Sequence, residues 1–383
     1  MKFNQINNLP GMQDNWGNCA TAAYQMQNDL NEFFNQNGYQ LIDTPILEES
    51  ELFIRKSGAE ISTKLFSFID QYGAKICLRP EITPSIIRHY IQNAENINLP
   101  FKIQYQGPIF RHDNTFRQNT QFGVEVIGGA QIEFESELIC LAVESLNEIG
   151  VNDFYIKLGN IGLIKDILSK FELSNTLKLF AMNNINDVLN NTISITGLVE
   201  KAQKLGLLDE LNSSNIKDPK LFLSKFSAVN EKNYLGRRTV EEILNRIELK
   251  SAIPNQKNNF ISALNCFMEI FSYNINNHNQ LDSIQQLIDS SSVNTTSVNS
   301  TKKLIEKIFS NGVSENSVKI DLGLTKGISY YTGLVFDIYQ TVGMKPLVIG
   351  GGGRYDSLVK AFGGKDVPAI GFAYNLDSIN LNK

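Results

Sequence analysis

The chain has 383 residues, of which 42% are hydrophobic and 20% are charged, and its formal net charge is −5. This composition predicts a packed core of two or three domains and argues against extended disorder. The acidic balance lacks the basic excess with which dedicated nucleic-acid binders neutralise phosphates. No stretch approaches the roughly 18 apolar residues that cross a bilayer, and the N-terminus has no apolar segment like that of a signal peptide. We therefore expect a soluble, cytoplasmic protein.

The first part of the chain alternates between helical and extended patterns. Apolar side chains at helical spacing predict a helix over 18–37, and Gly38 ends it. Further helices are expected at 83–93 and 134–150. Extended runs are predicted at 39–48, at 64–81 with a hairpin turn at 71–74, and at 101–113, 120–129 and 153–160.

The later part of the chain changes from helical to extended patterns. Helical periodicity with few strand signals begins near residue 172. Strand patterns return at 317–324, 333–342, 345–350 and 367–374. This order favours an α+β fold, in which an antiparallel sheet flanked by helices is interrupted by a mainly helical insertion. We therefore predict a core formed by 1–171 and 276–383, with the insertion at 172–275.

The cysteines and histidines are scattered. The four cysteines, Cys19, Cys77, Cys140 and Cys266, form no CxxC pair, and the three histidines do not cluster with them. Because a zinc site needs clustered ligands, we predict no metal site. No motif suggests a Ser-His-Asp nucleophile, and we predict no cofactor.

Glu81 and Thr83, in LRPEITPS, fall where a strand gives way to a helix. A carboxylate and a hydroxyl at this point can accept hydrogen bonds from an ammonium group. The alternative is that Thr83 caps the helix and that Glu81 interacts with its N-terminal dipole.

Gln121 and Glu125 belong to a predicted strand in QFGVEV. Residues two apart share a strand face, so Gln121, Gly123 and Glu125 point one way while the intervening apolar residues face the core. Arg111, which ends the preceding strand, could bind a carboxylate or a phosphate. The alternative for these polar groups is a solvated surface.

Two further segments are candidates for a ligand site. Lys326 precedes Tyr330 and Tyr331 in TKGISYYTG, where the tyrosines could form an aromatic wall with hydroxyl donors. The alternative is a hairpin turn whose tyrosines pack in the sheet. The glycine run 350–353 is expected to form a loop that lets a ligand approach the backbone, although it matches neither a P-loop nor a Rossmann fingerprint.

The order of these segments is more informative than any one of them. LPGMQD, LRPE, FRHD followed by RQNTQFGVE, KGISYYTG, GGGGRYD and PAIGFA resemble the motifs of class II histidyl-tRNA synthetases, over roughly 9–170 and 311–378. YYTG followed by GGGRYD is particular to the histidyl branch. The resemblance implies a class II synthetase core with a helical insertion before the YYTG segment, in agreement with the periodicity.

The resemblance also implies a set of histidine-binding residues. Glu81, Thr83 and Gln121 would face the ammonium group of the amino acid. Glu125 and Tyr331 would face the imidazole. Arg111 would face the carboxylate or an α-phosphate, Tyr330 would lie nearby, and Lys326 would add positive charge.

Several positions depart from the synthetase pattern. Lys326 stands where an arginine is expected and lacks the planar donor fork of a guanidinium. Ser329 replaces an aspartate, Asn119 an adenine-stacking phenylalanine, and Ser378 an ATP-binding arginine. The connection 111–117 is shorter and less basic than expected, and the end of the chain leaves no room for an anticodon-binding domain. Because adenylation needs cations on the phosphates, no catalysis is expected.

These departures make the chain similar to the regulatory subunits of ATP phosphoribosyltransferase. That resemblance implies a non-catalytic protein that activates a short catalytic subunit and mediates feedback by histidine. It also implies a homodimer, through 18–37 and 39–48, within a hetero-oligomer, with no tRNA partner. The alternatives are a divergent or truncated histidyl-tRNA synthetase, an amino-acid-activating paralogue, or a histidine-binding regulator with another partner.

Overall fold

The computed structural model describes most of the chain and divides it into two units. It describes residues 6–55, 61, 63–112, 117–129, 132–208, 255–271, 296–326, 330–343 and 345–381, with two short strands at 234–235 and 238–239. One unit comprises Met1–Leu163, Ile275–Gln285 and Thr296–Lys383, and the other comprises Ile164–Asn274 and Gln286–Thr295.

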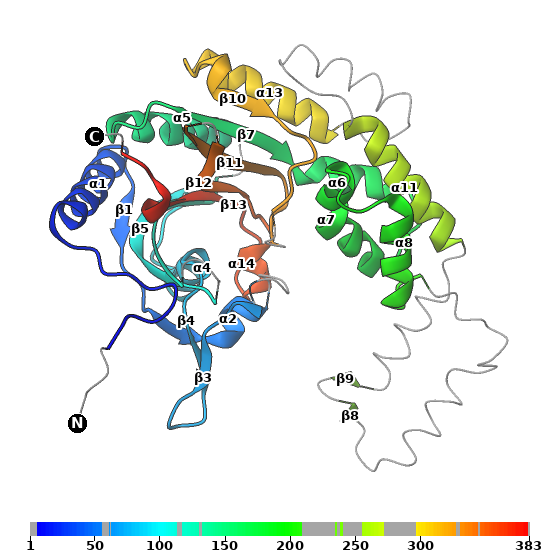
Figure 1. The fold of residues 1–383 in the computed structure, drawn as a ribbon, viewed down its shortest axis with the longest axis horizontal. Coiled ribbons are helices and arrows are strands. Elements are labelled where there is room, and N and C mark those ends of the chain that lie inside the picture. The colour runs from blue at the N-terminus through cyan, green and yellow to red at the C-terminus, as the bar shows by residue number, and fades with distance from the viewer. Residues whose placement is uncertain are drawn as a thin grey trace. The chain divides into compact units, whose positions relative to one another are not determined.

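An eight-stranded sheet forms the centre of the first unit (Figure 1). In spatial order its strands are β1 (Gln40–Ile42), β5 (Phe101–Phe110), β6 (Gln118–Ile127), β13 (Ala369–Asn375), β12 (Lys345–Arg354), β11 (Leu334–Val342), β7 (Phe154–Asn160) and β10 (Val318–Ile320). The inner pairs are antiparallel, as predicted, whereas β1 and β10 pair in parallel with β5 and β7 at the two edges. The predicted class of fold is confirmed, and the sheet is mixed rather than wholly antiparallel.

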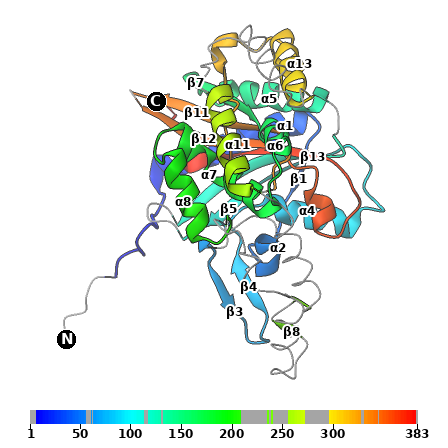
Figure 2. The same ribbon diagram turned by 90° about the vertical axis from the view of Figure 1, so that its right-hand side faces the viewer.

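A smaller three-stranded sheet contains the predicted hairpin (Figure 2). Its strands are β2 (Leu47–Glu49), β4 (Lys75–Leu78) and β3 (Ser67–Ile69), and the turn between β3 and β4 runs from Asp70 to Ala74. The Asp70 carboxylate accepts hydrogen bonds from the backbone N–H groups of Tyr72, at 2.9 Å, and Ala74, at 2.8 Å. The short helix α2 (Ser50–Ile54) follows β2 directly.

Helices α1 (Gly17–Gln36) and α5 (Ile132–Glu148) cover one face of the large sheet (Figure 1), and α13 (Thr296–Ser310) packs on α5. Phe34 of α1 packs on Phe122 and Phe372, with ring centroids 5.5 and 6.1 Å apart. The Tyr374 hydroxyl donates to the backbone carbonyl of Ala142 in α5 at 2.8 Å. The apolar residues that alternate with Gln121, Gly123 and Glu125 therefore form the helix-covered core, as predicted.

The opposite face of the sheet meets helix α4 (Thr83–Asn93), whereas α14 (Leu358–Ala361) packs on α4. On this face, in adjacent strands, Glu125 pairs with Gly371 and Gly371 pairs with Gly353. Large side chains are thus absent from the middle of this face, which leaves room for groups presented by α4.

The glycine run was wrongly predicted as a loop. Gly350 to Gly353 lie inside β12, paired with β11 on one side and β13 on the other. A Cβ on Gly350 would lie 2.7 Å from the carbonyl oxygen of Ala373, so the neighbouring backbone occupies the space of a side chain. Glycine is disfavoured in strands in general, but it is selected where another backbone or a ligand approaches this closely.

The second unit is mainly helical among its described residues. Helices α7 (Asn175–Leu189), α8 (Ile195–Lys204) and α11 (Gln256–Phe271) pack on one another, and α6 (Ile161–Ser169) crosses the boundary between the units. Ser174 and Ser194 cap α7 and α8 by accepting from backbone N–H groups three residues later. The strands β8 (Tyr234–Leu235) and β9 (Arg238–Thr239) pair in an antiparallel manner. Across the described helices of both units, none combines the length and hydropathy that crossing a bilayer requires.

We expect Phe34→Ala to destabilise the first unit by about 3–5 kcal/mol, because it removes a fully buried ring that joins α1 to two strands. Urea unfolding followed by circular dichroism measures the change. Tyr72→Ala, in the same unit but 85% exposed, is the matched control and should unfold at the wild-type midpoint. Equal midpoints for the two variants would contradict this role of Phe34.

Candidate functional site

A buried carboxylate lies at the centre of the site, on the sheet face that meets α4. Glu125 of β6 is 1% exposed. Its Oε1 accepts hydrogen bonds from the hydroxyls of Thr83, at 2.6 Å, and Tyr105, at 3.0 Å. Its Oε2 accepts a hydrogen bond from the Tyr355 hydroxyl. Three hydroxyl donors, from α4, from β5 and from the residue that follows β12, therefore fix the position of this carboxylate.

A second buried carboxylate belongs to the same constellation. Glu81, immediately before α4, accepts a hydrogen bond from the Tyr330 hydroxyl at 2.9 Å. The rings of Tyr330 and Tyr331 lie 5.0 Å apart, and Tyr355 lies 5.7 Å from Tyr330 and 6.5 Å from Tyr331. This tyrosine cluster connects Glu81 to Glu125, because Tyr330 donates to one carboxylate and Tyr355 donates to the other.

Burial changes the acid–base behaviour of this constellation. Burial raises the pKa of Glu125 to about 7, the donated hydrogen bonds oppose this shift, and the nearby charge of Glu81 adds to it. Burial and the two carboxylates likewise raise the pKa of Tyr330 and Tyr331 far above the ordinary tyrosine value. The tyrosines therefore remain neutral donors at any ordinary pH, while Glu125 can gain or lose its proton near neutrality.

Glycines in the sheet make room for these groups. A Cβ on Gly371 would overlap the Oε2 atom of Glu125, to which Gly371 is paired across the sheet. A Cβ on Gly123 would collide with the hydroxyl of Tyr105, and one on Gly353 would lie 3.0 Å from the ring of Tyr331. The glycines thus form the floor on which the carboxylate and the tyrosines lie.

Thr83 does not cap α4, in contrast to the simpler interpretation of the sequence. Ile82 occupies the N-cap position, and the Thr83 hydroxyl donates to Glu125 instead. The Gln121 side-chain oxygen accepts from the backbone N–H of Ile82 at 3.1 Å, which places Gln121 at the start of α4. Arg111 is part-buried, and its Nε donates to the carbonyl of Pro80 at 2.8 Å, next to Glu81.

Lys326 lies at the edge of this floor and is engaged in an ion pair. Its ammonium contacts the Asp337 carboxylate of β11 and occupies the space that a Cβ on Gly351 would need. Burial lowers the pKa of Lys326, and Asp337 opposes that shift. The positive charge of Lys326 is therefore balanced within the protein rather than presented alone to a ligand.

The structure brings most of the predicted site residues together. Direct contacts connect five of them, Glu81, Thr83, Glu125, Tyr330 and Tyr331, through Tyr355. Gln121 and Arg111 join the set through backbone groups at Ile82 and Pro80. Their role in binding histidine stays a prediction, because their positions are compatible with it without testing it.

Tyr105 and Tyr355 also belong to the site, but neither was predicted from the sequence. Tyr355 stands inside the quoted GGGGRYD segment, but without the fold nothing indicated that its hydroxyl reaches Glu125. Tyr105 pairs with Gly123 across β5 and β6, so it shares the face of Glu125. The alternation of side chains in 101–106 would have predicted that Tyr105 shares the face of Glu125 if the length of the turn between β5 and β6, which sets the register of this hairpin, had been known.

Three of the four departures from the synthetase pattern fall on described residues; Ser329 does not. Asn119 accepts a hydrogen bond from the side chain of Asn375 at 3.3 Å. Ser378 ends the 3₁₀ turn η3 (Leu376–Ser378), and the neighbouring Asp377 accepts from the backbone N–H of Thr120 at 2.5 Å. This end of the sheet therefore carries polar and acidic groups. The resemblance to the synthetases predicts an adenine-stacking phenylalanine at position 119 and an ATP-binding arginine at position 378.

The model of the histidyl-tRNA synthetase family matches residues 11–218 and 226–379 of the chain. The chain belongs to the histidyl-tRNA synthetase family. The histidine–tRNA ligase of Methanocaldococcus jannaschii is 28% identical over 93% of the chain and 71% of the relative. That of Methanococcus aeolicus is 31% identical over 93% of the chain and 72% of the relative.

Solved structures of this family share the fold. A Bacillus halodurans protein described as an ATP phosphoribosyltransferase regulatory subunit/histidyl-tRNA synthetase superposes with a TM-score of 0.71, at 22% identity, over 98% of the chain and 83% of that protein. The apo histidyl-tRNA synthetase of S. aureus superposes with a TM-score of 0.58, at 20% identity, over 97% of the chain and 72% of that protein. These likenesses establish the class II synthetase-like fold.

We expect the Glu125→Gln protein to gain stability relative to the wild type as the pH rises from 5 to 8. The pKa of Glu125 in the folded protein is about 7, against an ordinary value of 4.5, so within this window the folded state binds a proton that the unfolded state has released. The contribution of Glu125 to stability is therefore lost as the pH rises, and glutamine, which cannot ionise, avoids that loss.

Urea unfolding at pH 5, 6, 7 and 8 tests this expectation. Glu148→Gln, which changes an exposed carboxylate at the end of α5, is the matched control and should differ from the wild type by the same amount at every pH. If the difference between E125Q and the wild type were also independent of pH, Glu125 would not ionise in this range.

Proposed function

We propose that the chain is a non-catalytic, histidine-binding regulatory subunit of ATP phosphoribosyltransferase, which activates a short catalytic subunit and mediates feedback by histidine. The proposal that the chain binds histidine rests on two buried carboxylates, Glu81 and Glu125. Each of them accepts a hydrogen bond from a tyrosine hydroxyl. Histidine offers an ammonium group and an imidazole N–H, and a carboxylate can accept from each of them. Charge-assisted bonds of this kind are the strong ones in a desolvated site.

The state of Lys326 supports the absence of catalysis. Stabilising the charge that develops on phosphates requires preorganised cations directed at them. Lys326 is paired with Asp337 and buried, and as an ammonium it lacks the forked geometry of arginine. A site of this kind favours holding an amino acid over activating it with ATP.

The regulatory part of the proposal draws on similarity and on exposed surface. A similar fold is described as an ATP phosphoribosyltransferase regulatory subunit/histidyl-tRNA synthetase. Tyr24 of α1 and Leu41 of β1 are 69% and 59% exposed, in the segments proposed to form the homodimer. Feedback further requires histidine to favour one state of the complex over another, because a ligand shifts an equilibrium only through its differential affinity.

A divergent or truncated histidine–tRNA ligase is the second candidate function. The names of the relatives favour it, since proteins 28–31% identical to the chain are described as histidine–tRNA ligases. The two candidates differ in their use of ATP, because only the ligase forms a histidyl-adenylate and releases pyrophosphate.

We expect calorimetry to detect histidine binding by the full chain, and Glu125→Ala to weaken it by at least tenfold, because a charge-assisted hydrogen bond is lost from a buried site. Glu148→Ala, which removes an exposed carboxylate, is the control and should bind as the wild type does. Unchanged affinity in the Glu125→Ala protein would remove the proposed role of Glu125.

Two activity measurements separate the candidate functions. We expect the chain to raise the rate of a short-form ATP phosphoribosyltransferase and to make that rate sensitive to histidine. We also expect no histidine-dependent exchange of pyrophosphate into ATP. Exchange catalysed by the purified chain would overturn the regulatory proposal in favour of the ligase.

A further inference from the structure

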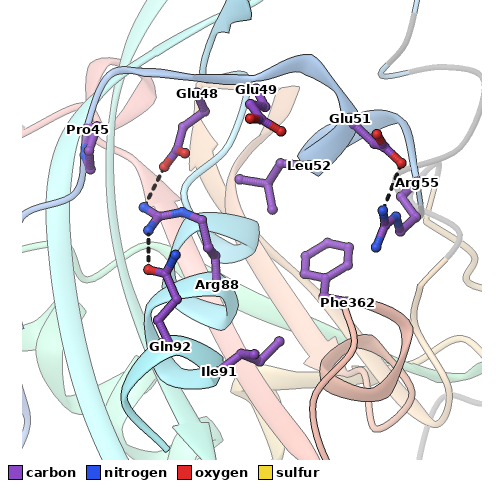
Figure 3. A pocket seen from close by; sticks show the side chains of 10 residues that line it. All are labelled: Pro45, Glu48, Glu49, Glu51, Leu52, Arg55, Arg88, Ile91, Gln92 and Phe362. Carbon is purple, nitrogen blue, oxygen red and sulfur yellow. Dashed lines mark hydrogen bonds and ion pairs between the residues drawn. The ribbon is translucent and has the colours of Figure 1, made fainter.

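A second cavity, separate from the tyrosine-lined site, opens between β2, α2, α4 and the segment after α14 (Figure 3). Its volume is about 480 Å³, within the roughly 300–1,000 Å³ range of small-molecule sites. None of its lining residues belongs to the constellation around Glu125.

The walls of this cavity combine a flat cation with apolar groups. Figure 3 shows the guanidinium of Arg88 and the ring of Phe362 on opposite sides of the opening, with Leu52 between them and Ile91 below. Arg88 is held in place, because it donates to Glu48 at 2.8 Å and to Gln92 at 3.0 Å. A guanidinium fixed in this way presents a planar face on which an aromatic ring can stack.

One of the carboxylates that line the cavity does not form an ion pair with a described residue. Glu48 pairs with Arg88, and Glu51 pairs with Arg55 at 2.8 Å. Glu49 has no ion-pair partner among the residues that the structure describes, and Figure 3 shows its carboxylate turned toward the opening above Leu52. With three glutamates against two arginines, the lining carries one net negative charge, and its unpaired member is Glu49.

We propose that this cavity binds a planar aromatic or heteroaromatic ligand that bears a cationic nitrogen group. The ring stacks between Arg88 and Phe362 and covers Leu52 and Ile91, and the nitrogen group donates to Glu49. The acidic excess disfavours phosphorylated or carboxylated ligands, because Glu48 already neutralises Arg88. The cationic group and the ring are thus both required for tight binding.

Three probes of the same shape test this proposal on the full chain: benzamidine, which is cationic, benzamide, which is neutral, and benzoate, which is anionic. Titration followed by ligand-observed NMR gives their affinities. We expect benzamidine to bind about tenfold more tightly than benzamide, with benzoate weakest, because the amidinium makes a charge-assisted bond to Glu49. Equal binding of the three probes would overturn the proposal.

Matched variants locate the probe. Glu49→Gln should weaken benzamidine by about tenfold and leave benzamide unchanged, whereas Glu148→Gln should alter neither. Phe362→Leu should weaken both benzamidine and benzamide, because the ring contact is shared. If Glu49→Gln behaved like Glu148→Gln, or if Glu125→Gln were the change that weakened benzamidine, the probe would lie elsewhere and the proposal would be wrong.

Discussion

The burial of Glu125 is the constraint on which the rest of the site depends. A carboxylate without water is costly unless hydrogen bonds replace its solvation. Thr83, Tyr105 and Tyr355 supply those bonds, and they come from α4, β5 and the residue after β12. Segments far apart in sequence must therefore meet at one point before the carboxylate is satisfied, which couples the site to the assembly of the whole sheet.

The helix-covered face of the sheet makes this assembly possible. Phe34, Phe122 and Phe372 fill one side, so the strands can present small residues on the other side without losing their packing. Alternate residues of the same strands therefore have different roles, because they point to opposite faces of the sheet. The apolar face stabilises the fold, and the glycine-rich face holds the polar groups.

Local patterns predicted local elements well. The helix at the start of the chain, the hairpin turn and the alternation in β6 follow from periodicity and turn chemistry, and all agree with the structure. The glycine run was misread because its reason is non-local: the constraint comes from the backbone of β13, such as the carbonyl of Ala373. Tyr105 and Tyr355 were missed for the same cause, since their partner Glu125 is distant in sequence. The parallel edge strands also depend on contacts that periodicity cannot report.

The glycine at 371 has a consequence for how this fold tolerates change. A Cβ there would overlap Oε2 of Glu125 and lie 2.5 Å from the backbone carbonyl oxygen of Val124, so substitution at this position would move the carboxylate away from the Tyr355 hydroxyl. By contrast, Ser378 ends the turn η3 and is only half-buried. Substitutions near Ser378, at the outer end of the site, are therefore tolerated more readily than substitutions at Gly371, which would disturb the buried Glu125 carboxylate.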